Sequence, residues 1–300
     1  MKKRTILLIA SFCLLLLLTG CGSTATDKPI TANEGWFEQV MVIPIGYILE
    51  FFAKTFNNNF AMGVLFATII VRTICWPIYA KSNDYMLKMQ LLNPELQRLQ
   101  QKYALRKDPE AQQQMQMEMM KLYKKYEINP LGCMVTFLQM PVFMAMYQCV
   151  VRITVGNVYN EDGKLLYESL FFKGVEIDHK LFGFIDLSVS SQKAGWQGWI
   201  LPILVGATML LLQYFGSKKP KYAKNVPTPQ ASEQAEQMQR TMKIMNYVMV
   251  GMMVVMSISS GALAFYWVVG NLYSLGQQLI SRELSNRKYE KMKNQGIIGG

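Results

Sequence analysis

The sequence predicts an all-α, polytopic membrane protein with five transmembrane helices, an N-terminal interfacial helix and a cytoplasmic helical hairpin. Three observations lead to this fold class. Hydrophobic residues make up 51% of the 300 residues and charged residues only 17%, against roughly 25% charged residues in an average soluble domain. The apolar residues gather into runs close to the roughly 20 residues that a helix needs to cross a bilayer. The basic residues gather in alternate segments between those runs.

The chain begins with a predicted signal peptide at residues 1–20. Basic residues at 2–4 precede an apolar stretch, and Leu-Thr-Gly stands directly before Cys21. This order is typical of a secretory signal. The sequence Leu-Thr-Gly-Cys at 18–21 resembles a bacterial lipobox. This resemblance implies a lipoprotein with a diacylglycerol thioether on Cys21 and a mature N-terminus held outside the cell by lipid. An uncleaved signal anchor with a chance cysteine is the alternative.

Residues 21–59 are the predicted extracellular N-terminal segment, in which 36–56 forms an amphipathic helix. The helix is apolar overall but carries several charges. These charges are spaced four residues apart, in two pairs: Glu34 and Glu38, and Glu50 and Lys54. Because such spacing gathers charge on one side, we expect the helix to lie in the membrane interface. A sixth span is the alternative.

Five longer apolar runs are predicted to span the membrane: 60–80, 134–151, 198–215, 244–259 and 262–280. At 1.5 Å per residue most of them approach the roughly 30 Å of a hydrocarbon core. The fourth reaches only roughly 24 Å, so it must lean on neighbouring helices or sit in a thinned bilayer.

Charge predicts the orientation of these spans. Three segments together carry a net charge of +10: 81–133, 216–243 and 281–300. Two others together carry a net charge of −4: 22–59 and 156–195. The excess of Lys and Arg places the first group in the cytoplasm. The N-terminal segment and the loop 152–197 are therefore expected outside, and the basic tail 281–300 inside.

The segment 81–133 is predicted to form a helical hairpin, with a turn at 106–109 where the sequence reads Arg-Lys-Asp-Pro. Its second half is rich in methionine, including Met115, Met119 and Met120. Because methionine is flexible and polarizable, it suits contact with varied partners. We therefore expect these three residues to meet a client protein or a targeting factor. The alternative is that they only join the two helices to each other.

Arg72 stands in the middle of the first predicted span. A lone arginine at that depth costs roughly 2.5–3.5 kcal/mol on insertion scales, and no acidic residue occurs in any of the five spans. Such a side chain must face water, protein dipoles or a partner molecule. We expect a hydrated cavity that holds this positive charge. An arginine that caps backbone carbonyls inside the helix bundle is the alternative.

Other polar side chains in the spans are expected to line the same cavity: Gln139, Gln213, Trp267 and Asn271. Such groups need partners in a membrane, and five spans are few for hiding them all from lipid. A groove open to the cytoplasm and partly to lipid would hydrate them.

No cofactor, metal or enzymatic activity is expected. The sequence has one His and five scattered Cys without a CxxC pair, which argues against a zinc site and a disulfide framework. It also has no Gly-rich phosphate loop and no Gly-x-Ser-x-Gly motif.

The sequence resembles the YidC family of membrane protein insertases, in the short form of Gram-positive bacteria. The resemblance covers roughly residues 35–285 and rests on several stretches taken together, with their positions as follows: Thr-Ile-Ile-Val-Arg at 68–72, Trp-Pro at 76–77, Asn-Pro-Leu-Gly-Cys at 129–133, Gln-Met-Pro-Val-Phe at 139–143 and Phe-Tyr-Trp-Val-Val-Gly-Asn at 265–271.

The resemblance implies a groove open to the cytoplasm and to lipid but closed outside, with Arg72 as its positive charge. It implies nascent membrane proteins as clients, with the ribosome, the Sec translocon and membrane lipid as further partners, and no small-molecule substrate. A polytopic transporter and a scaffold that holds other membrane proteins without translocating them are the alternatives. The basic tail 281–300 suits either ribosomal RNA or anionic lipid.

Overall fold

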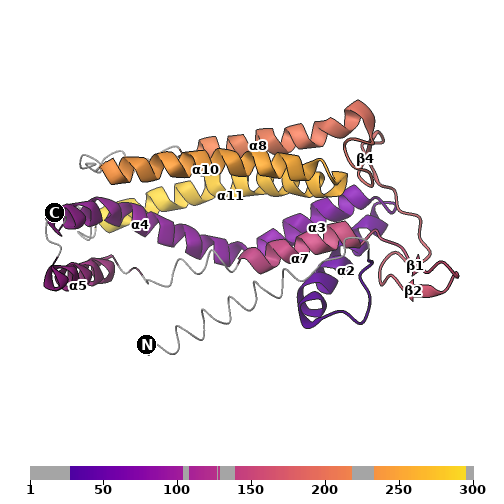
Figure 1. Cartoon of the computed structure of the whole chain (residues 1–300), viewed down its shortest axis with the longest axis horizontal. Coiled ribbons are helices and arrows are strands. Elements are labelled where there is room, and N and C mark those ends of the chain that lie inside the picture. The colour runs from indigo at the N-terminus through magenta and orange to yellow at the C-terminus, as the bar shows by residue number, and fades with distance from the viewer. Residues whose placement is uncertain (1–27, 104–107, 127, 129–138, 218–232, 295–300) are drawn as a thin grey trace. The chain divides into compact units, whose positions relative to one another are not determined.

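The computed structural model describes residues 28–103, 108–126, 128, 139–217 and 233–294 (Figure 1). The predicted signal peptide, the lipidation site Cys21 and the first residues of the predicted span 134–151 lie outside the described residues. The chain divides into two compact units. Unit 1 consists of the residues up to Val71 together with Gln139–Val189, and unit 2 consists of Arg72–Leu138 together with Ser190–Gly300.

The described residues are mostly helical, which confirms the all-α class. The structure adds four short strands to it, all within the predicted loop 152–197. Strand β1 (Val158–Tyr159) pairs with β2 (Leu165–Tyr167), and β3 (Lys180–Leu181) pairs with β4 (Ile185–Asp186), each pair antiparallel. Both pairs are local hairpins closed by turns that contain glycine, so they extend the loop without changing the fold class.

Unit 1 is built from a π-helical turn and three α-helices, with bounds as follows: Glu38–Val42 for the turn, Ile43–Thr55 for α2, Phe60–Ile74 for α3 and Gln139–Arg152 for α7. Only the part of α3 up to Val71 belongs to this unit. The expected helix over 36–56 is therefore present, as a π-helical turn that continues into α2.

Helices α2 and α3 pack closely because Gly63 has no side chain. A Cβ atom at this position would lie 2.7 Å from the carbonyl oxygen of Leu49. The connection between the helices runs through Asn57 and Asn58, whose φ angles of 57° and 60° are left-handed. Asparagine tolerates this region better than most residues, so the local sequence favours a tight turn here.

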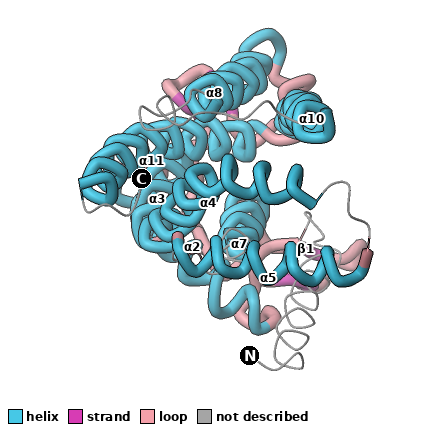
Figure 2. The backbone as a smooth tube through the Cα atoms, turned by 90° about the vertical axis from the view of Figure 1, so that its left-hand side faces the viewer, coloured by secondary structure: helices cyan, strands magenta, loops and turns pink. Residues whose placement is uncertain are grey.

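Unit 2 contains three long helices that lie side by side in both views (Figures 1 and 2): α8 (Ile200–Ser217), α10 (Glu233–Ser257) and α11 (Gly261–Asn294). A short 3₁₀ turn, Gly195–Trp199, leads into α8. The hydroxyl of Ser260 accepts a hydrogen bond from the backbone N–H of Leu263 at 3.3 Å. This contact caps the start of α11.

Helices α4 (Trp76–Tyr103) and α5 (Pro109–Lys125) pack against each other in unit 2. Asp108 begins α5, because its carboxylate accepts a hydrogen bond from the N–H of Ala111 at 3.1 Å and Pro109 occupies the first helical position. Helix α4 runs without a break from the end of the predicted span through most of the predicted hairpin. No change of secondary structure therefore marks residue 80.

The predicted span 60–80 is bent where α3 meets α4. The two helices form an angle of 54° across Cys75. Pro77 explains the break, because proline has no N–H to donate to the carbonyl of Thr73 and its ring clashes with that turn. The bend lies three residues after Arg72.

Among the described residues, one helix is long and apolar enough to cross a membrane by itself, Gly195–Gly216. The bent pair Phe60–Ile74 and Trp76–Ser82 makes a second if it counts as one span, and Ile244–Ser257 is a shorter apolar helix. The predicted five-span topology is not confirmed by length and composition alone. Two of the expected spans do not meet this criterion of length and apolar composition. Only 14 residues of α7 are described, which is too short. Helix α11 carries amide side chains such as Gln277, which make it less apolar.

Candidate functional site around Arg72

Arg72 lies in the last turn of α3, where its half-buried guanidinium group faces α11. Its Nη1 atom donates a hydrogen bond to the hydroxyl of Ser274 at 2.6 Å. Next to it, the hydroxyls of Thr73 and Tyr273 lie 2.8 Å apart and form a second hydrogen bond between the same two helices. These two contacts fix the end of α3 against the middle of α11.

Gly270 allows this close approach. A Cβ atom at position 270 would lie 2.7 Å from Nη2 of Arg72 and 3.3 Å from Cζ. The hydroxyl of Tyr266, which is buried, also hydrogen-bonds to Arg72. Tyr266, Gly270 and Ser274 are spaced four residues apart, so they form one stripe along α11 that receives the arginine.

No carboxylate among the described residues forms an ion pair with Arg72; the ion pairs present join other residues. Its partners in that part of the chain are neutral hydroxyls. A guanidinium group has five N–H donors, and two hydroxyls leave some of them available for an incoming acceptor. Chemically, the site is a positive charge held in place by neutral hydrogen bonds.

The other polar residues expected beside Arg72 are distributed over α8 and α11. Asn271 donates from its side-chain amide to the hydroxyl of Thr208 on α8 at 3.1 Å. The indole N–H of Trp267 and the amide oxygen of Gln213 are buried and have no hydrogen-bond partner among the described residues. Among the described residues, no hydrogen bond joins any of these three to Arg72. Gln139 begins α7 in unit 1, and its side chain lies outside the described part.

The three methionines expected to meet clients divide into two groups. Met115 and Met119 pack against the buried cluster of Leu99, Tyr103 and Ala111 between α4 and α5. Met120 is 61% exposed. The first two therefore help to hold the hairpin together, and only the third presents its side chain to the surroundings.

The hairpin also carries a shallow cavity of about 390 Å³ between α4 and α5, lined mainly by charged side chains such as Arg98, Lys121 and Glu118. Lys102 donates to Glu118 at 2.9 Å. This hydrogen bond raises the pKa of Lys102 and lowers that of Glu118. Burial and a hydrogen bond to Glu95 raise the pKa of Tyr126. At neutral pH Lys102 therefore stays protonated, Glu118 ionised and Tyr126 neutral.

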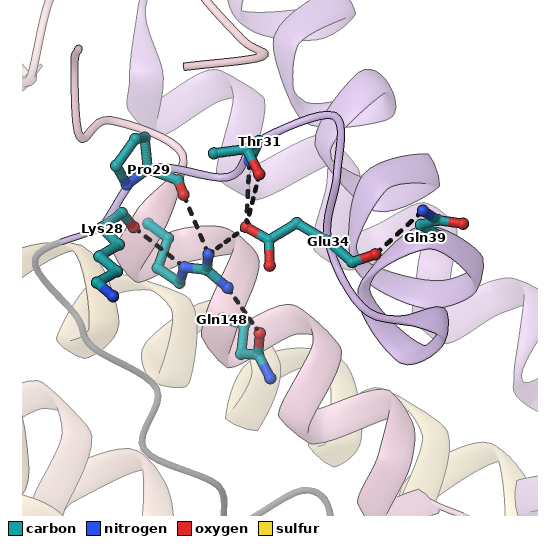
Figure 3. Close-up of polar contacts among 7 residues, drawn as sticks. Lys28, Pro29, Thr31, Glu34, Gln39 and Gln148 are labelled. Atoms are coloured by element: carbon teal, nitrogen blue, oxygen red, sulfur yellow. Dashed lines mark hydrogen bonds and ion pairs between the residues drawn. The ribbon is translucent and has the colours of Figure 1, made fainter. Parts of the chain in front are cut away.

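A second arginine, Arg152, forms a buried network at the end of α7 in unit 1 (Figure 3). It donates to the carbonyl oxygens of Lys28 and Pro29 at 3.1 and 3.0 Å and to the amide oxygen of Gln148 at 3.1 Å. It also forms an ion pair with Glu34 at 2.6 Å. Four acceptors thus surround one buried cation, and they fasten the segment after residue 27 to α7.

Neither the Arg152 network nor the stripe on α11 was predicted from the sequence. The four-residue spacing predicted that Glu34 and Glu38 share one side of a helix, but Glu34 lies before the helical residues and pairs with Arg152 instead. In both places a four-residue spacing in the sequence could have indicated the contact. Gln148 stands four residues before Arg152, and small or hydroxyl-bearing residues recur every fourth position around Gly270.

Gly270→Ala is expected to displace the guanidinium group of Arg72 and to weaken its bond to Ser274, because the new methyl group would lie 2.7 Å from Nη2. Glycine in a helix costs roughly 0.5–1 kcal/mol relative to alanine, so the helix itself should not suffer. The NMR resonance of the Arg72 Nε–H group measures the displacement. Gly276→Ala on the same helix is the control, because its Cβ would meet nothing within 4 Å. Unchanged Arg72 resonances in both variants would contradict the close contact between Gly270 and Arg72.

Comparison with known proteins agrees with the resemblance noted in the sequence. A family model described as 60Kd inner membrane protein matches residues 51–288. The chain is 32% identical over 283 residues to the membrane protein insertase YidC of Oceanobacillus iheyensis, covering 93% of this chain and 96% of that protein. It is 29% identical over 283 residues to the membrane protein insertase MisCA of Bacillus subtilis, covering 93% and 92% respectively. The chain therefore belongs to the 60Kd inner membrane protein family, the family of the YidC membrane protein insertases.

Proposed function

We propose that Arg72 is the charge by which this insertase attracts its clients, in a polar groove that client segments enter from the cytoplasm. The observation that carries the proposal is the setting of Arg72. Its guanidinium group is held by neutral hydroxyls on α11, and no carboxylate among the described residues neutralises it. A positive charge positioned in this way is available to an anionic partner.

The neighbouring polar groups support a hydrated groove. Buried polar atoms in folded proteins almost always have a hydrogen-bond partner, yet Gln213 and Trp267 have none among the described residues. Water or the backbone of a passing client would satisfy them. Gln139 and Asn271 are proposed to line the same path.

The mechanism follows from electrostatics and hydrophobic transfer. An acidic extracellular tail of a client is attracted to Arg72, and one ion pair at 4 Å gives about 4 kcal/mol at an effective dielectric constant of about 20, before desolvation. This is comparable to the roughly 2.5–3.5 kcal/mol that a charge costs at the centre of a membrane helix. The apolar segment of the client then leaves for the lipid, which supplies the driving force. No nucleotide or other cofactor takes part.

The proposed topology is that of a multi-pass protein of the bacterial cell membrane. Five spans cross it at 60–80, 134–151, 198–215, 244–259 and 262–280. The N-terminus lies outside on the lipidated Cys21, and the C-terminal tail lies in the cytoplasm. The distribution of basic residues supports this orientation, and the bend at Cys75 lets α4 leave the membrane after Arg72.

The cytoplasmic hairpin is proposed to receive the client or a targeting factor through its exposed methionines, Met120 and Met117. The ribosome and the Sec translocon are the proposed larger partners. In the tail, Lys288 pairs with Asp84 on α4 and Arg287 pairs with Glu283. Both contacts engage basic residues that would otherwise be available to ribosomal RNA or anionic lipid.

Site-specific photocrosslinking tests the proposed path. A photoreactive residue at Gln139 or Trp267 should form adducts with the membrane-spanning segment of a ribosome-bound client. A scaffold would give adducts only with finished proteins. A transporter would give none and would instead show solute flux that depends on Arg72.

Leu272 provides the matched control position. It lies on α11 next to Asn271 and is 52% exposed, so a photoreactive residue there reports contact outside the proposed groove. Client adducts as frequent at Leu272 as at Trp267 would argue against a defined path along α11.

A further inference from the structure

The hairpin of β3 and β4 ends in an apolar tip made of Phe182, Gly183 and Phe184. Phe182 is 81% exposed, more than any other large hydrophobic side chain among the described residues, and Phe184 is 50% exposed. The flanking Leu181 and Ile185 are buried and pair across the ladder. The hairpin therefore has its own small core, and the two phenylalanines do not belong to it.

The backbone holds Phe182 in an unfavourable conformation. Its φ angle is 53° and that of Gly183 is 80°. These two left-handed residues are the centre of a turn in which the N–H of Phe184 donates to the carbonyl of Leu181 at 3.3 Å. The turn lies within the three-residue loop between the paired Leu181 and Ile185. Such turns favour Asn-Gly or Asp-Gly, and a bulky side chain with positive φ is an outlier. Strained residues of this kind cluster where a side chain has a function. An exposed aromatic ring at a strained tip indicates a partner.

The base of the same hairpin is fastened to the start of α3. The N–H of Phe60 donates to the carbonyl of Asp178 at 2.9 Å, and the N–H of Asp178 donates to the carbonyl of Asn58 at 3.0 Å. The side-chain amide of Asn59 donates to the carboxylate of Asp178 at 2.9 Å. The ring of His179 lies against that of Phe60, with centroids 5.6 Å apart. These contacts fix the base of the hairpin next to Phe60, the first residue of α3.

We propose that Phe182 and Phe184 insert into the outer interfacial layer of the bilayer, beside the extracellular end of α3. This rests on the proposed topology, in which Phe60 begins the first span at the outer surface. Phe182 is the fourth residue after Asp178, so the tip lies within about 13 Å of the end of that span. The interfacial layer is about 5–8 Å deep on each side of a core of roughly 30 Å, which brings the tip within reach of it.

The distribution of charge along the hairpin fits a lipid surface. Asp178, Lys180 and Asp186 all lie at its base, so the charged groups remain at the level of the headgroups or above. Only aromatic and glycine residues occupy the tip. Aromatic rings beside charged groups are the side chains that favour the boundary between headgroups and acyl chains. The bilayer is also the one surface that the proposed span necessarily brings close to the tip.

The test places p-benzoylphenylalanine at position 182 in the full-length protein, reconstituted in phosphatidylcholine and phosphatidylglycerol vesicles. Because Phe182 makes no core contact, the aromatic replacement should not disturb folding. Irradiation followed by mass spectrometry should show phospholipid adducts. Tyr159 in β1 is the matched control, since it is 56% exposed but lies in the other hairpin. We expect several-fold more lipid adducts from position 182 than from position 159.

Equal lipid yields at the two positions, or adducts from position 182 with a client or a second copy of this chain in place of lipid, would overturn the proposal. A separate measurement tests the topology on which it rests. A p-azidophenylalanine at Phe56, which is 39% exposed beside the turn before α3 and has a negative φ, should react in intact cells with a membrane-impermeant alkyne reagent. Labelling at position 56 without lipid adducts at position 182 would reject the hairpin insertion alone, whereas failure of labelling would reject the topology.

Discussion

Arg72→Ala is expected to slow the insertion of a single-span client with an acidic extracellular tail by roughly 10- to 100-fold in proteoliposomes. The substitution removes the charge that offsets the transfer of a carboxylate into the membrane. One ion pair is worth about 4 kcal/mol before desolvation, and a loss of about 1.4–2.7 kcal/mol in the barrier corresponds to that change in rate. The measurement is the fraction of protease-protected client over time.

Two companion variants separate charge from position. Arg72→Lys should retain much of the activity, because the positive charge stays although the planar fork of donors is lost. Ser274→Ala removes the hydrogen bond at 2.6 Å that positions the guanidinium group and should give an intermediate rate. A client with a neutral tail should respond weakly to all of these changes. If Arg72→Ala inserts the acidic client as fast as the unmodified protein, attraction by Arg72 is not how the insertase works.

Arg152→Met is expected to detach the segment 28–34 from the end of α7 in unit 1. The change leaves the carboxylate of Glu34 and the carbonyls of Lys28 and Pro29 without their cationic partner. Removing one member of a buried ion pair costs about 3–5 kcal/mol, because the other member remains buried and uncompensated. The amide of Leu170, which donates to the carbonyl of Ile30 at 2.8 Å, reports the opening. Its hydrogen exchange should accelerate by roughly 100-fold or more.

An exposed ion pair in the same unit provides the control. Lys173 and Glu168 lie 2.6 Å apart, but both side chains are more than half exposed. Lys173→Met should therefore change stability by less than about 1 kcal/mol. The double variant Glu34→Gln and Arg152→Met should be less destabilised than the sum of its single changes, since neither residue then leaves a buried charge behind. Additive effects would show that the two side chains do not act as a pair.

Much of the architecture is predictable from the sequence because it depends on local chemistry. Helices dominate as expected, and Asp108 and Pro109 start α5 where the turn was predicted. The break after Arg72 is also encoded locally, because Pro77 cannot complete the helical hydrogen bonds. The two β-hairpins were not predicted, since strands of two or three residues are too short to show a periodic pattern.

The candidate site was only partly predictable. Hydropathy alone singled out Arg72, because a charge within an apolar run is conspicuous. Its partners were not predictable, because Ser274 is 202 residues away in sequence. The methionines show the same limit. Composition marked Met115, Met119 and Met120 as a group, but packing divides them, because only the position of each residue around α5 relative to α4 determines whether it is covered.

The sequence by itself determined the family, the helical class and the presence of one unbalanced charge in an apolar segment, because each of these is written in residue types and their order. The tertiary structure alone decided which groups meet that charge. It placed Gly270 and Ser274 of α11 against Arg72, and it enclosed Arg152 with Glu34 and two backbone carbonyls. The physical reason is that both cations are held by short-range hydrogen bonds between segments remote in sequence. Such contacts form only once the helices have packed.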